Sequence, residues 1–494
     1  MSPILLLLFA GTFLFSTTTF LVLSKRQRDV LFRRFHIRGR RASTSKTPPR
    51  SLSPSKKNSN TATGIDYTNA FPPSRREALA NIISKLPRAE RIKFLGHEVD
   101  SQTFARSQIP FDADWRQCDG NLFTPCGFSV AEIRALGDFP DYAELSGIPL
   151  PQPYKEFNID KAIPRPYRPF RWVYHQTMSI TKMEIDWWIE LENTYRKRIE
   201  QRRELFRKHG NMVLDYLPGS ELACKELMEM VLQFVCARYP QYFSLSSDNT
   251  IFHNKILNTE TKIKSKHPLH VLLENIPEDF AITLRNPETG YYHFRAGLLC
   301  SALGWNVQTK LGMDLPSIHT PIPDYKEKMQ FSMDRYFTKK PTDRAIQRGS
   351  WGLEVDQPLF MPPGDPKETY RLSQDPNLTL DRLHLRVDWQ TLRRLPLSAA
   401  IVFNFKALFT PISEFRDEPY VPALVNKVLK EGKKNLMEYK GTWHVEHVAI
   451  PALNEWEREQ VEKGMVEDGW EVRTLEESPW FPGWQEKWHR QQGY

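Results

Sequence analysis

Cysteine is scarce in this chain, and the sequence motifs of several large enzyme classes are missing. The five cysteines among 494 residues include no Cys-x-x-Cys pair, which argues against a zinc ribbon and a covalently attached haem. No Gly-x-Gly-x-x-Gly or Gly-x-x-x-x-Gly-Lys-Ser/Thr segment occurs, so both common nucleotide-binding fingerprints are absent. Gly-x-Ser-x-Gly and His-Glu-x-x-His are missing too, which removes the hydrolase nucleophile elbow and the zincin site. Cysteines that are few and odd in number indicate reduced thiols facing the cytosol.

Excess positive charge is absent from the main body of the chain, although the whole chain has a net charge of +9. Residues 25–57 hold twelve Lys or Arg and one acidic residue, a net charge of +11, and the first 24 residues have no charged side chain. The difference between +9 and +11 leaves a net charge of −2 for everything after residue 57. The folded body therefore shows no general basic character, and no nucleic-acid partner is predicted.

One long hydrophobic run is present, at the N-terminus. Residues 3–23 contain no charged side chain and, at about 1.5 Å per helical residue, reach roughly 30 Å, the thickness of a bilayer core. A basic n-region and a small-x-small cleavage site are both missing, so residues 1–24 are predicted to be an uncleaved transmembrane anchor rather than a signal peptide. Because the positive charge follows this helix, we expect the N-terminus outside or in a lumen and the main domain in the cytosol. The sequence does not indicate which membrane.

The basic arm at residues 25–57 has two interpretations. It binds anionic lipid headgroups, at roughly 1 kcal/mol per well-placed cation, or it is only a stop-transfer flank that leads into a disordered linker. Ser, Thr, Pro, Lys and Asn dominate the chain up to residue 64, which is typical of a tether. Residues 25–64 are therefore predicted to be a basic disordered linker, and both interpretations of the arm stay open.

Helices are predicted on both sides of a central group of strands. The predicted helices lie at residues 129–136, 185–209, 220–239, 421–431 and 452–464. The predicted strands lie at residues 280–285, 291–299, 383–388 and 399–409. Asn-Pro-Glu-Thr-Gly at 286–290 consists of residues that favour turns and is predicted to join the first two strands into a hairpin. A short helical piece is expected around Leu392. Strands clustered between helices predict an α+β fold rather than a doubly wound sheet, after a Pro-rich extension at residues 65–153.

Three blocks of the chain combine Arg, His and aromatic residues in an unusual way. The first is Arg-Pro-Tyr-Arg-Pro-Phe-Arg-Trp at 165–172, which leads into the Trp-rich helix. The second contains Ile-His-Thr-Pro-Ile-Pro at 318–323, preceded by Gly304-Trp305 and followed by Met-Asp-Arg-Tyr-Phe at 333–337. The third is Leu-Arg-Val-Asp-Trp-Gln-Thr-Leu-Arg-Arg-Leu-Pro at 385–396, with a strand after it.

Taken together and in this order, the three blocks resemble the haem-dependent oxidative N-demethylase alpha-subunit-like family, over residues 154–432. The resemblance implies a PAS-like antiparallel sheet core with flanking helices, bound haem b, and oxidative removal of an N-methyl group from a small amine. In that family electrons come from separate flavin and iron–sulfur subunits. The resemblance therefore implies a separate electron-donor protein, in agreement with the missing nucleotide motifs. Residues 433–494 form a C-terminal helical, Trp-rich extension that we expect to pack onto the domain.

Four residues are the candidates for holding the haem. The Ile-His-x-Pro-x-Pro block resembles the family's haem-ligand position and places His319 there, because a neutral imidazole between rigid prolines is a good axial ligand. A buried histidine bonded to a backbone carbonyl is the alternative. Arg386, Arg393 and Arg394 are candidates to pair with the haem propionates, since guanidinium groups bind carboxylates bidentately. For at least two of them, an ordinary structural or surface charge is the alternative. No catalytic residue is assigned.

The chain departs from the family pattern at several positions. Where the family has Glu-Arg-Gln, this chain has Asp-Trp-Gln at 388–390, and where the family has Arg-Thr-Tyr it has Lys406, Ala407 and Leu408. The changes at Trp389, Ala407 and Leu408 remove groups that orient a substrate or donate a proton. A retained fold with altered chemistry, or with none, is therefore a serious alternative.

Two other functions remain possible from the sequence. The first is a noncatalytic PAS-like module that binds a ligand or a partner. The second and less favoured is a glycosyltransferase, because an anchor, a stem and Asp112-Ala113-Asp114 imitate that layout. The expected cytosolic location of the domain argues against the second function, since such enzymes face the lumen.

Overall fold

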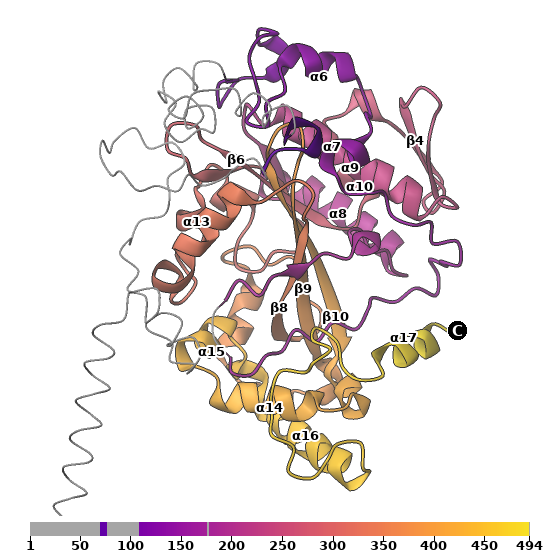
Figure 1. Cartoon of the computed structure of the whole chain (residues 1–494). Helices are drawn as coiled ribbons and strands as arrows, with labels where there is room; N and C mark the ends of the chain where they lie inside the picture. The colour runs from indigo at the N-terminus through magenta and orange to yellow at the C-terminus, as the bar shows by residue number, and fades with distance from the viewer. Residues whose placement is uncertain (1–69, 77–107, 175–176, 494) are drawn as a thin grey trace, which may run out of the picture. The chain divides into compact units, whose positions relative to one another are not determined.

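The computed structural model describes residues 70–76, 108–174 and 177–493, and these residues alone are considered below (Figure 1). The predicted anchor and linker, residues 1–24 and 25–64, lie outside them, as does most of the Pro-rich extension up to residue 107. Within the described ranges, no helix has both the length and the apolar character needed to cross a bilayer.

A seven-stranded antiparallel sheet forms the centre of the structure and confirms the predicted α+β class. The strand order is β1-β8-β9-β10-β6-β7-β2. The bounds are Thr181–Lys182 for β1, Leu214–Tyr216 for β2, Asp279–Arg285 for β6, Tyr292–Leu298 for β7, Ile346–Val355 for β8, Leu383–Arg394 for β9 and Ile401–Pro411 for β10. A smaller sheet contains β3 (Phe243–Leu245), β4 (Ile251–Asn254) and β5 (Thr259–Lys262). The hairpin predicted around residues 286–290 is confirmed as β6 and β7. The PAS-like character of the sheet stays a prediction.

Strand β9 is longer than predicted, and the short helix expected around Leu392 is wrong. β9 pairs with β10 from His384 to Arg394 and with β8 from Leu383 to Leu392. Ladders on both sides satisfy the backbone groups of β9, so pairing overrides the local preference that favoured a helical piece.

The helices agree with the prediction at most positions, with one clear exception. Ser129 caps α6 through a capping box, as the spacing to Glu132 requires. The long helix predicted at 185–209 is broken, because residues 188–192 turn inward and are buried before α8 begins. The α-helix bounds are Val130–Leu136 for α6, Tyr142–Ser146 for α7, Tyr195–His209 for α8, Glu221–Arg238 for α9, Pro268–Asn275 for α10, Val307–Lys310 for α11, Leu315–Ile318 for α12, Gln330–Lys339 for α13, Val421–Glu431 for α14, Lys434–Lys440 for α15, Trp443–Glu462 for α16 and Trp484–Gln492 for α17.

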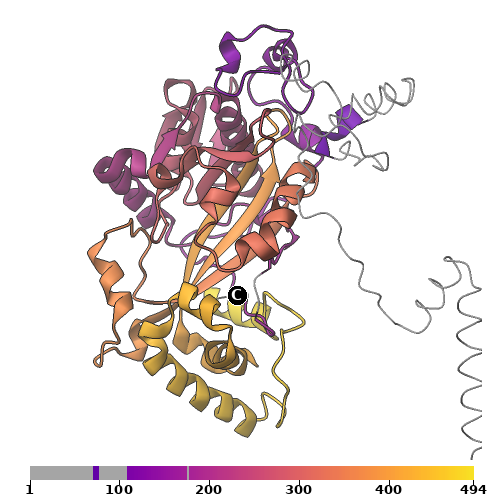
Figure 2. The same cartoon turned by 90° about the vertical axis from the view of Figure 1, so that its left-hand side faces the viewer.

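Both faces of the large sheet are covered by helices, and strand alternation decides which side chains meet which layer. One face carries Phe280 and Val402, which pack in a core with residues of α8, α9 and α10. Farther along the same face, Leu385 and Leu408 pack with residues of α14 and α16. The opposite face carries Phe403, which packs with residues of α11, α12 and α13. Figure 2 shows the long strands running from the group of helices around α9 to the C-terminal helices.

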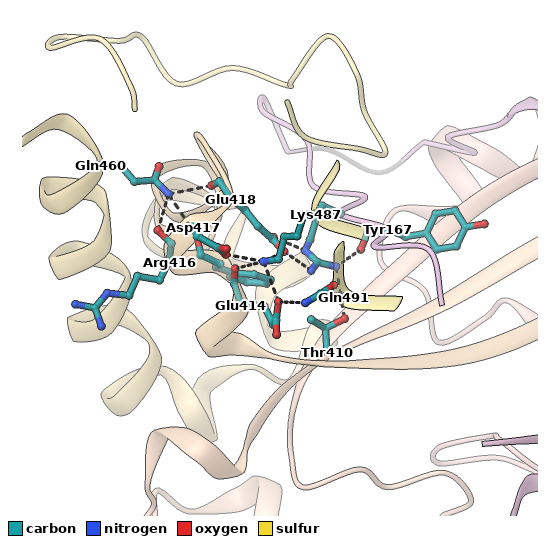
Figure 3. Close-up of polar contacts among 11 residues, drawn as sticks. Tyr167, Thr410, Glu414, Arg416, Asp417, Glu418, Gln460, Lys487 and Gln491 are labelled. Carbon is teal, nitrogen blue, oxygen red and sulfur yellow. Dashed lines mark hydrogen bonds and ion pairs between the residues drawn. The ribbon is translucent and has the colours of Figure 1, made fainter. Parts of the chain in front are cut away.

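Ion pairs centred on the buried Glu418 hold α17 of the C-terminal extension against the segments that flank the large sheet (Figure 3). The Arg168 guanidinium donates two hydrogen bonds of 2.6 Å to Glu418, whose carboxylate is fully buried. The Lys487 amino group of α17 lies 3.1 Å from Glu418 and 2.6 Å from Asp417. Trp488, also in α17, donates to the carbonyl oxygen of Ile163 at 3.0 Å. The expected packing of the Trp-rich tail onto the domain is confirmed.

Candidate functional site

His319 ends the short helix α12, and a hydrogen bond to the helix backbone fixes its imidazole. Asp314 caps the start of α12 and Pro316 occupies its first turn, so the sequence sets this helix locally. The Nδ1 atom of His319 lies 2.7 Å from the carbonyl oxygen of Leu315. The ring stacks on Tyr325, with centroids 5.0 Å apart and planes 14° apart. The side chain is half-buried.

The contact with Leu315 determines which ring nitrogen carries the proton. A carbonyl oxygen only accepts hydrogen bonds, so Nδ1 is the protonated nitrogen and Nε2 keeps its lone pair. No side chain or backbone group in the described ranges hydrogen-bonds to Nε2. The carbonyl-bonded histidine and the iron ligand therefore do not exclude each other, since one nitrogen serves the fold and the other is left for a metal.

The environment of His319 keeps the imidazole neutral. Burial lowers its pKa to about 4, the bond to Leu315 opposes this effect, and the positive charges of Lys310 and Arg348 lower it further. A neutral ring is the form that ligates iron, so it is competent at physiological pH.

The surroundings of His319 combine aromatic rings with positive charge. Register places Arg348 of β8 opposite Gln390 of β9, and Gln390 opposite Phe405 of β10. Phe403 and Phe405 pack against side chains near α11 and α12 but are only half-buried. We call the following half-buried residues the His319 surface: Trp305, Lys310, Ile318, His319, Arg348, Gln390, Phe403 and Phe405.

Two cations on the His319 surface have no acidic partner within the described part of the chain. The Lys310 amino group lies 4.3 Å from the centre of the Trp305 ring, and burial alone lowers its pKa to about 8. The Arg348 side chain forms no hydrogen bond or ion pair with the other described residues, and its Nε atom is buried without a partner. Burial first, and then the charge of Arg171, lower the pKa of Arg348. Positive charges without counter-charges next to the apolar side chains of Phe403 and Phe405 suit a ligand that is mostly apolar and carries carboxylates.

The three arginines predicted to hold propionates are placed differently. Arg386 donates to Asp388 at 2.8 Å, to the carbonyl oxygen of Pro358 at 2.7 Å, and to that of Ser301. Arg394 donates to the carbonyl oxygens of Lys340, Ala399 and Phe337. Arg393 is buried and stacks over Trp188, with its guanidinium carbon 4.1 Å from the ring centre.

Strand geometry keeps these three side chains apart. Arg393 and Arg394 are consecutive in β9, so they point to opposite faces of the sheet. Arg386 and Arg394 share a face but are eight positions apart, which corresponds to roughly 26 Å along a strand. The structure therefore does not gather the three arginines at one site. Sequence reasoning did not single out Lys310 and Arg348 as cations without an acidic partner in the described ranges, because pairing depends on tertiary contacts.

The departures from the family pattern fall on both faces. Lys406 and Leu408 lie on the face opposite Phe405, where Lys406 donates to the carbonyl oxygen of Glu190 and Leu408 packs in the core. Trp389 lies on that face too and stacks on Tyr167 at 3.9 Å between centroids. Among the three positions 389, 407 and 408, only Ala407 shares the face of the His319 surface.

The Asp-x-Asp motif at 112–114 and a small cavity beside β8 do not form a metal or haem site. Asp112 pairs with Arg295, and Asp114 pairs with Arg116 at 2.6 Å, so internal ion pairs occupy the Asp-x-Asp motif. The part of the chain that the structure describes contains no group of three metal-ligating side chains. A cavity beside β8, lined in part by Arg171 and Arg348, measures about 20 Å³, enough for a water molecule rather than a porphyrin.

One family model matches the chain over residues 179–450, more than half of its length. Its description is haem-dependent oxidative N-demethylase, alpha subunit-like. The matched residues contain β8, β9 and β10 and every residue of the His319 surface. Arg168 and Lys487 lie outside the match, yet both bind Glu418 inside it. The chain belongs to the haem-dependent oxidative N-demethylase alpha-subunit-like family.

Proposed function

We propose that the chain binds haem b at the His319 surface and oxidatively removes an N-methyl group from a small amine. The observation that carries the proposal is the neutral imidazole of His319, with Nδ1 bonded to Leu315 and Nε2 without a hydrogen-bond partner among the residues that the structure describes. Lys310 and Arg348, two cations that no described acidic residue pairs with, lie near it. These donors fit an iron porphyrin, which needs one nitrogen ligand for the metal and positive charge for two carboxylates.

Each group of the site has a separate task in this proposal. His319 supplies Nε2 to the iron, and the bond from Nδ1 to Leu315 holds the ring in place. Lys310 and Arg348 attract the carboxylates, while Phe403 and Phe405 offer apolar surface to the porphyrin and exclude water. Gln390 presents an amide that orients a small polar substrate. Bound haem supplies the iron at which oxygen is reduced and the N-methyl group is oxidised.

The partners of this reaction follow from the sequence. Because no nucleotide-binding motif is present, we propose that a separate electron-donor protein reduces the haem. We also propose that residues 3–23 anchor the chain in a membrane and that the arm at 25–57 contacts anionic lipid. In that arrangement the N-terminus is outside or lumenal and the main domain is cytosolic.

A hemin titration of the purified full-length chain, followed by oxygen consumption, tests the proposal. We expect saturable uptake of one haem, and oxygen consumption that requires a methylated amine and a chemical reductant. Lys310→Met combined with Arg348→Gln should weaken hemin uptake, whereas Arg416→Gln, at an exposed ion pair with Glu459, should not. Failure of the full-length chain to bind hemin would reject the proposal.

A noncatalytic haem or ligand sensor is the second candidate. Ala407 favours it, because this position faces the side of His319 and carries no hydroxyl where the family has threonine. A sensor would bind hemin without consuming oxygen in the presence of methylated amines. Ala407→Thr would then leave oxygen consumption at the background rate, whereas an enzyme with a weakened site would gain activity.

A further inference from the structure

Four aromatic side chains form a continuous stack from the sheet to the C-terminal helix. Trp389 and Tyr167 have ring centroids 3.9 Å apart, with planes 20° apart. Tyr167 stacks on Trp480 at 4.6 Å and 30°. Trp480 stacks on Trp484 at 4.1 Å and 12°. All three neighbouring pairs are in direct stacking contact, with planes no more than 30° apart.

The two ends of this stack lie in different surroundings. Trp389 is 5% exposed and sits in β9, directly before Gln390 of the His319 surface. Trp484 is the first residue of α17 and is partly exposed. The stack therefore joins the strand that borders the candidate site to a ring that reaches solvent.

The tyrosine in the middle of the stack has a base in contact with its hydroxyl. The Tyr167 hydroxyl donates to a carboxylate oxygen of Glu190 at 2.9 Å, and it accepts a hydrogen bond from Arg165 at 2.5 Å. Burial alone would raise the pKa of Glu190, but Arg165 and Lys406 bring it below its usual value. Glu190 is therefore ionised, and its hydrogen bond with the Tyr167 hydroxyl positions it to take the proton of the oxidised phenol, a strong acid, and to return it.

We propose that this stack is an electron relay that carries oxidising equivalents away from the His319 surface. The proposal rests on the proposed function, because an oxygen-derived oxidant forms there when oxygen is reduced and no amine is oxidised. One electron moves at each step, from Trp389 to the oxidant, from Tyr167 to Trp389, from Trp480 to Tyr167, and from Trp484 to Trp480.

Charge and protons balance along this path. When Tyr167 loses its electron, the phenol proton passes to Glu190, and it returns when Trp480 reduces the tyrosine. The net result is that the oxidant gains one electron, while Trp484 loses one electron and releases its indole proton to water. Oxidative modification then occurs at the partly exposed Trp484 rather than at the residues proposed to hold the haem.

The test uses a photo-oxidant and needs no haem. A ruthenium label is attached through Gln390→Cys in the full-length chain with Cys118→Ser and Cys236→Ser, because both thiols are partly exposed. A light pulse with an electron-accepting quencher generates the oxidant one residue from Trp389 along β9, on the opposite face of the sheet from its ring. Transient absorption then reports tryptophan radicals, and peptide mass spectrometry reports where oxidation is retained.

The relay predicts that Trp484 is oxidised more than Trp443, although Trp443 is 55% exposed and Trp484 less so. Tyr167→Phe keeps a ring in the stack but removes the oxidisable phenol, so oxidation of Trp484 should fall to the level of the dark control. Trp480→Phe should have the same effect and replaces Tyr167→Phe if that variant does not fold.

Two results would overturn the relay: oxidation of Trp484 that is unchanged by both substitutions, or oxidation that simply follows exposure, with Trp443 modified most. A chain that takes up no hemin would instead reject the proposed function. The photochemical result separates these two failures, because its oxidant is the label.

Discussion

The Nδ1 atom of His319 donates to the carbonyl oxygen of Leu315 at 2.7 Å, and this bond leaves the lone pair of the ring on Nε2. The interaction comes from the helix itself, since Leu315 opens α12 and His319 caps its end. A ring held in this way needs no acidic side chain for orientation. The site consequently keeps an excess of positive charge, which the carboxylates of a porphyrin would neutralise.

The low pKa of His319 predicts a specific dependence of stability on pH. Because burial lowers the pKa from 6.5 to about 4, the unfolded chain takes up this proton before the folded chain does. The contribution of His319 to folding stability is therefore complete above pH 6.5 and is lost as the pH falls toward 4. Urea unfolding of the haem-free protein between pH 7 and pH 4 measures it. His319→Gln should show a smaller loss over this window, and an equal loss in both proteins would contradict the assignment.

The two cations beside His319 should contribute to hemin affinity. Lys310→Met and Arg348→Gln are each expected to weaken hemin binding about tenfold, equivalent to about 1.4 kcal/mol for a lost charge-assisted contact. The effect should decrease at high salt, as expected for pairs near the surface. Fluorescence quenching by hemin measures the affinity. Unchanged affinity in both variants would place the carboxylates elsewhere.

Arg386 is predicted to stabilise the fold rather than the haem. Its guanidinium holds Asp388 and the carbonyl oxygens of Pro358 and Ser301, so Arg386→Met leaves several acceptors unpaired. The free energy of unfolding should fall by about 2–4 kcal/mol, with hemin affinity unchanged. Arg382→Met, at an exposed pair with Asp356, should cost less than about 1 kcal/mol. If the folded Arg386→Met protein bound hemin more weakly than the wild type, Arg386 would be a haem-binding residue and the prediction would be wrong.

The buried carboxylate of Glu418 should be among the most sensitive positions for stability. Glu418→Gln removes the charge that balances both Arg168 and Lys487, and an unbalanced buried charge costs about 3–5 kcal/mol. Denaturant unfolding measures this loss. Lys487→Met should loosen α17 and expose Trp488, with a smaller effect on the sheet. Equal stability of wild type and Glu418→Gln would show that packing alone holds the C-terminal extension.

Local sequence signals predicted a large part of this fold. The helix predicted at residues 129–136 matches α6, the turn residues at 286–290 predicted the β6–β7 hairpin, and the clustering of strands predicted the α+β class. These features depend on residues close together in the chain. The length of β9 was missed because its partners β8 and β10 stabilise it, and no single-segment pattern contains that information.

The candidate site was predictable only in part. His319 stood out because prolines surround it, and the structure fixes its ring through Nδ1 and shows no described residue bonded to Nε2. The arginines of β9 looked equivalent in sequence. In the structure, Arg386 and Arg394 donate hydrogen bonds to backbone carbonyl oxygens, and Arg393 lies on the opposite face of the sheet. Whether a cation is paired depends on contacts between distant segments. For the same reason, the unpaired Arg348 could not be recognised from its neighbours.

The visible absorption spectrum of the purified full-length chain with hemin tests the central claim most directly. The account predicts a Soret band typical of imidazole ligation in the wild type, its loss or shift in His319→Gly, and recovery of the band when free imidazole is added to that variant. His293→Ala is the matched control, because His293 also places Nδ1 against a carbonyl, that of Gly312 at 3.0 Å. An identical spectrum for wild type and His319→Gly, or no hemin uptake by either, would contradict the account.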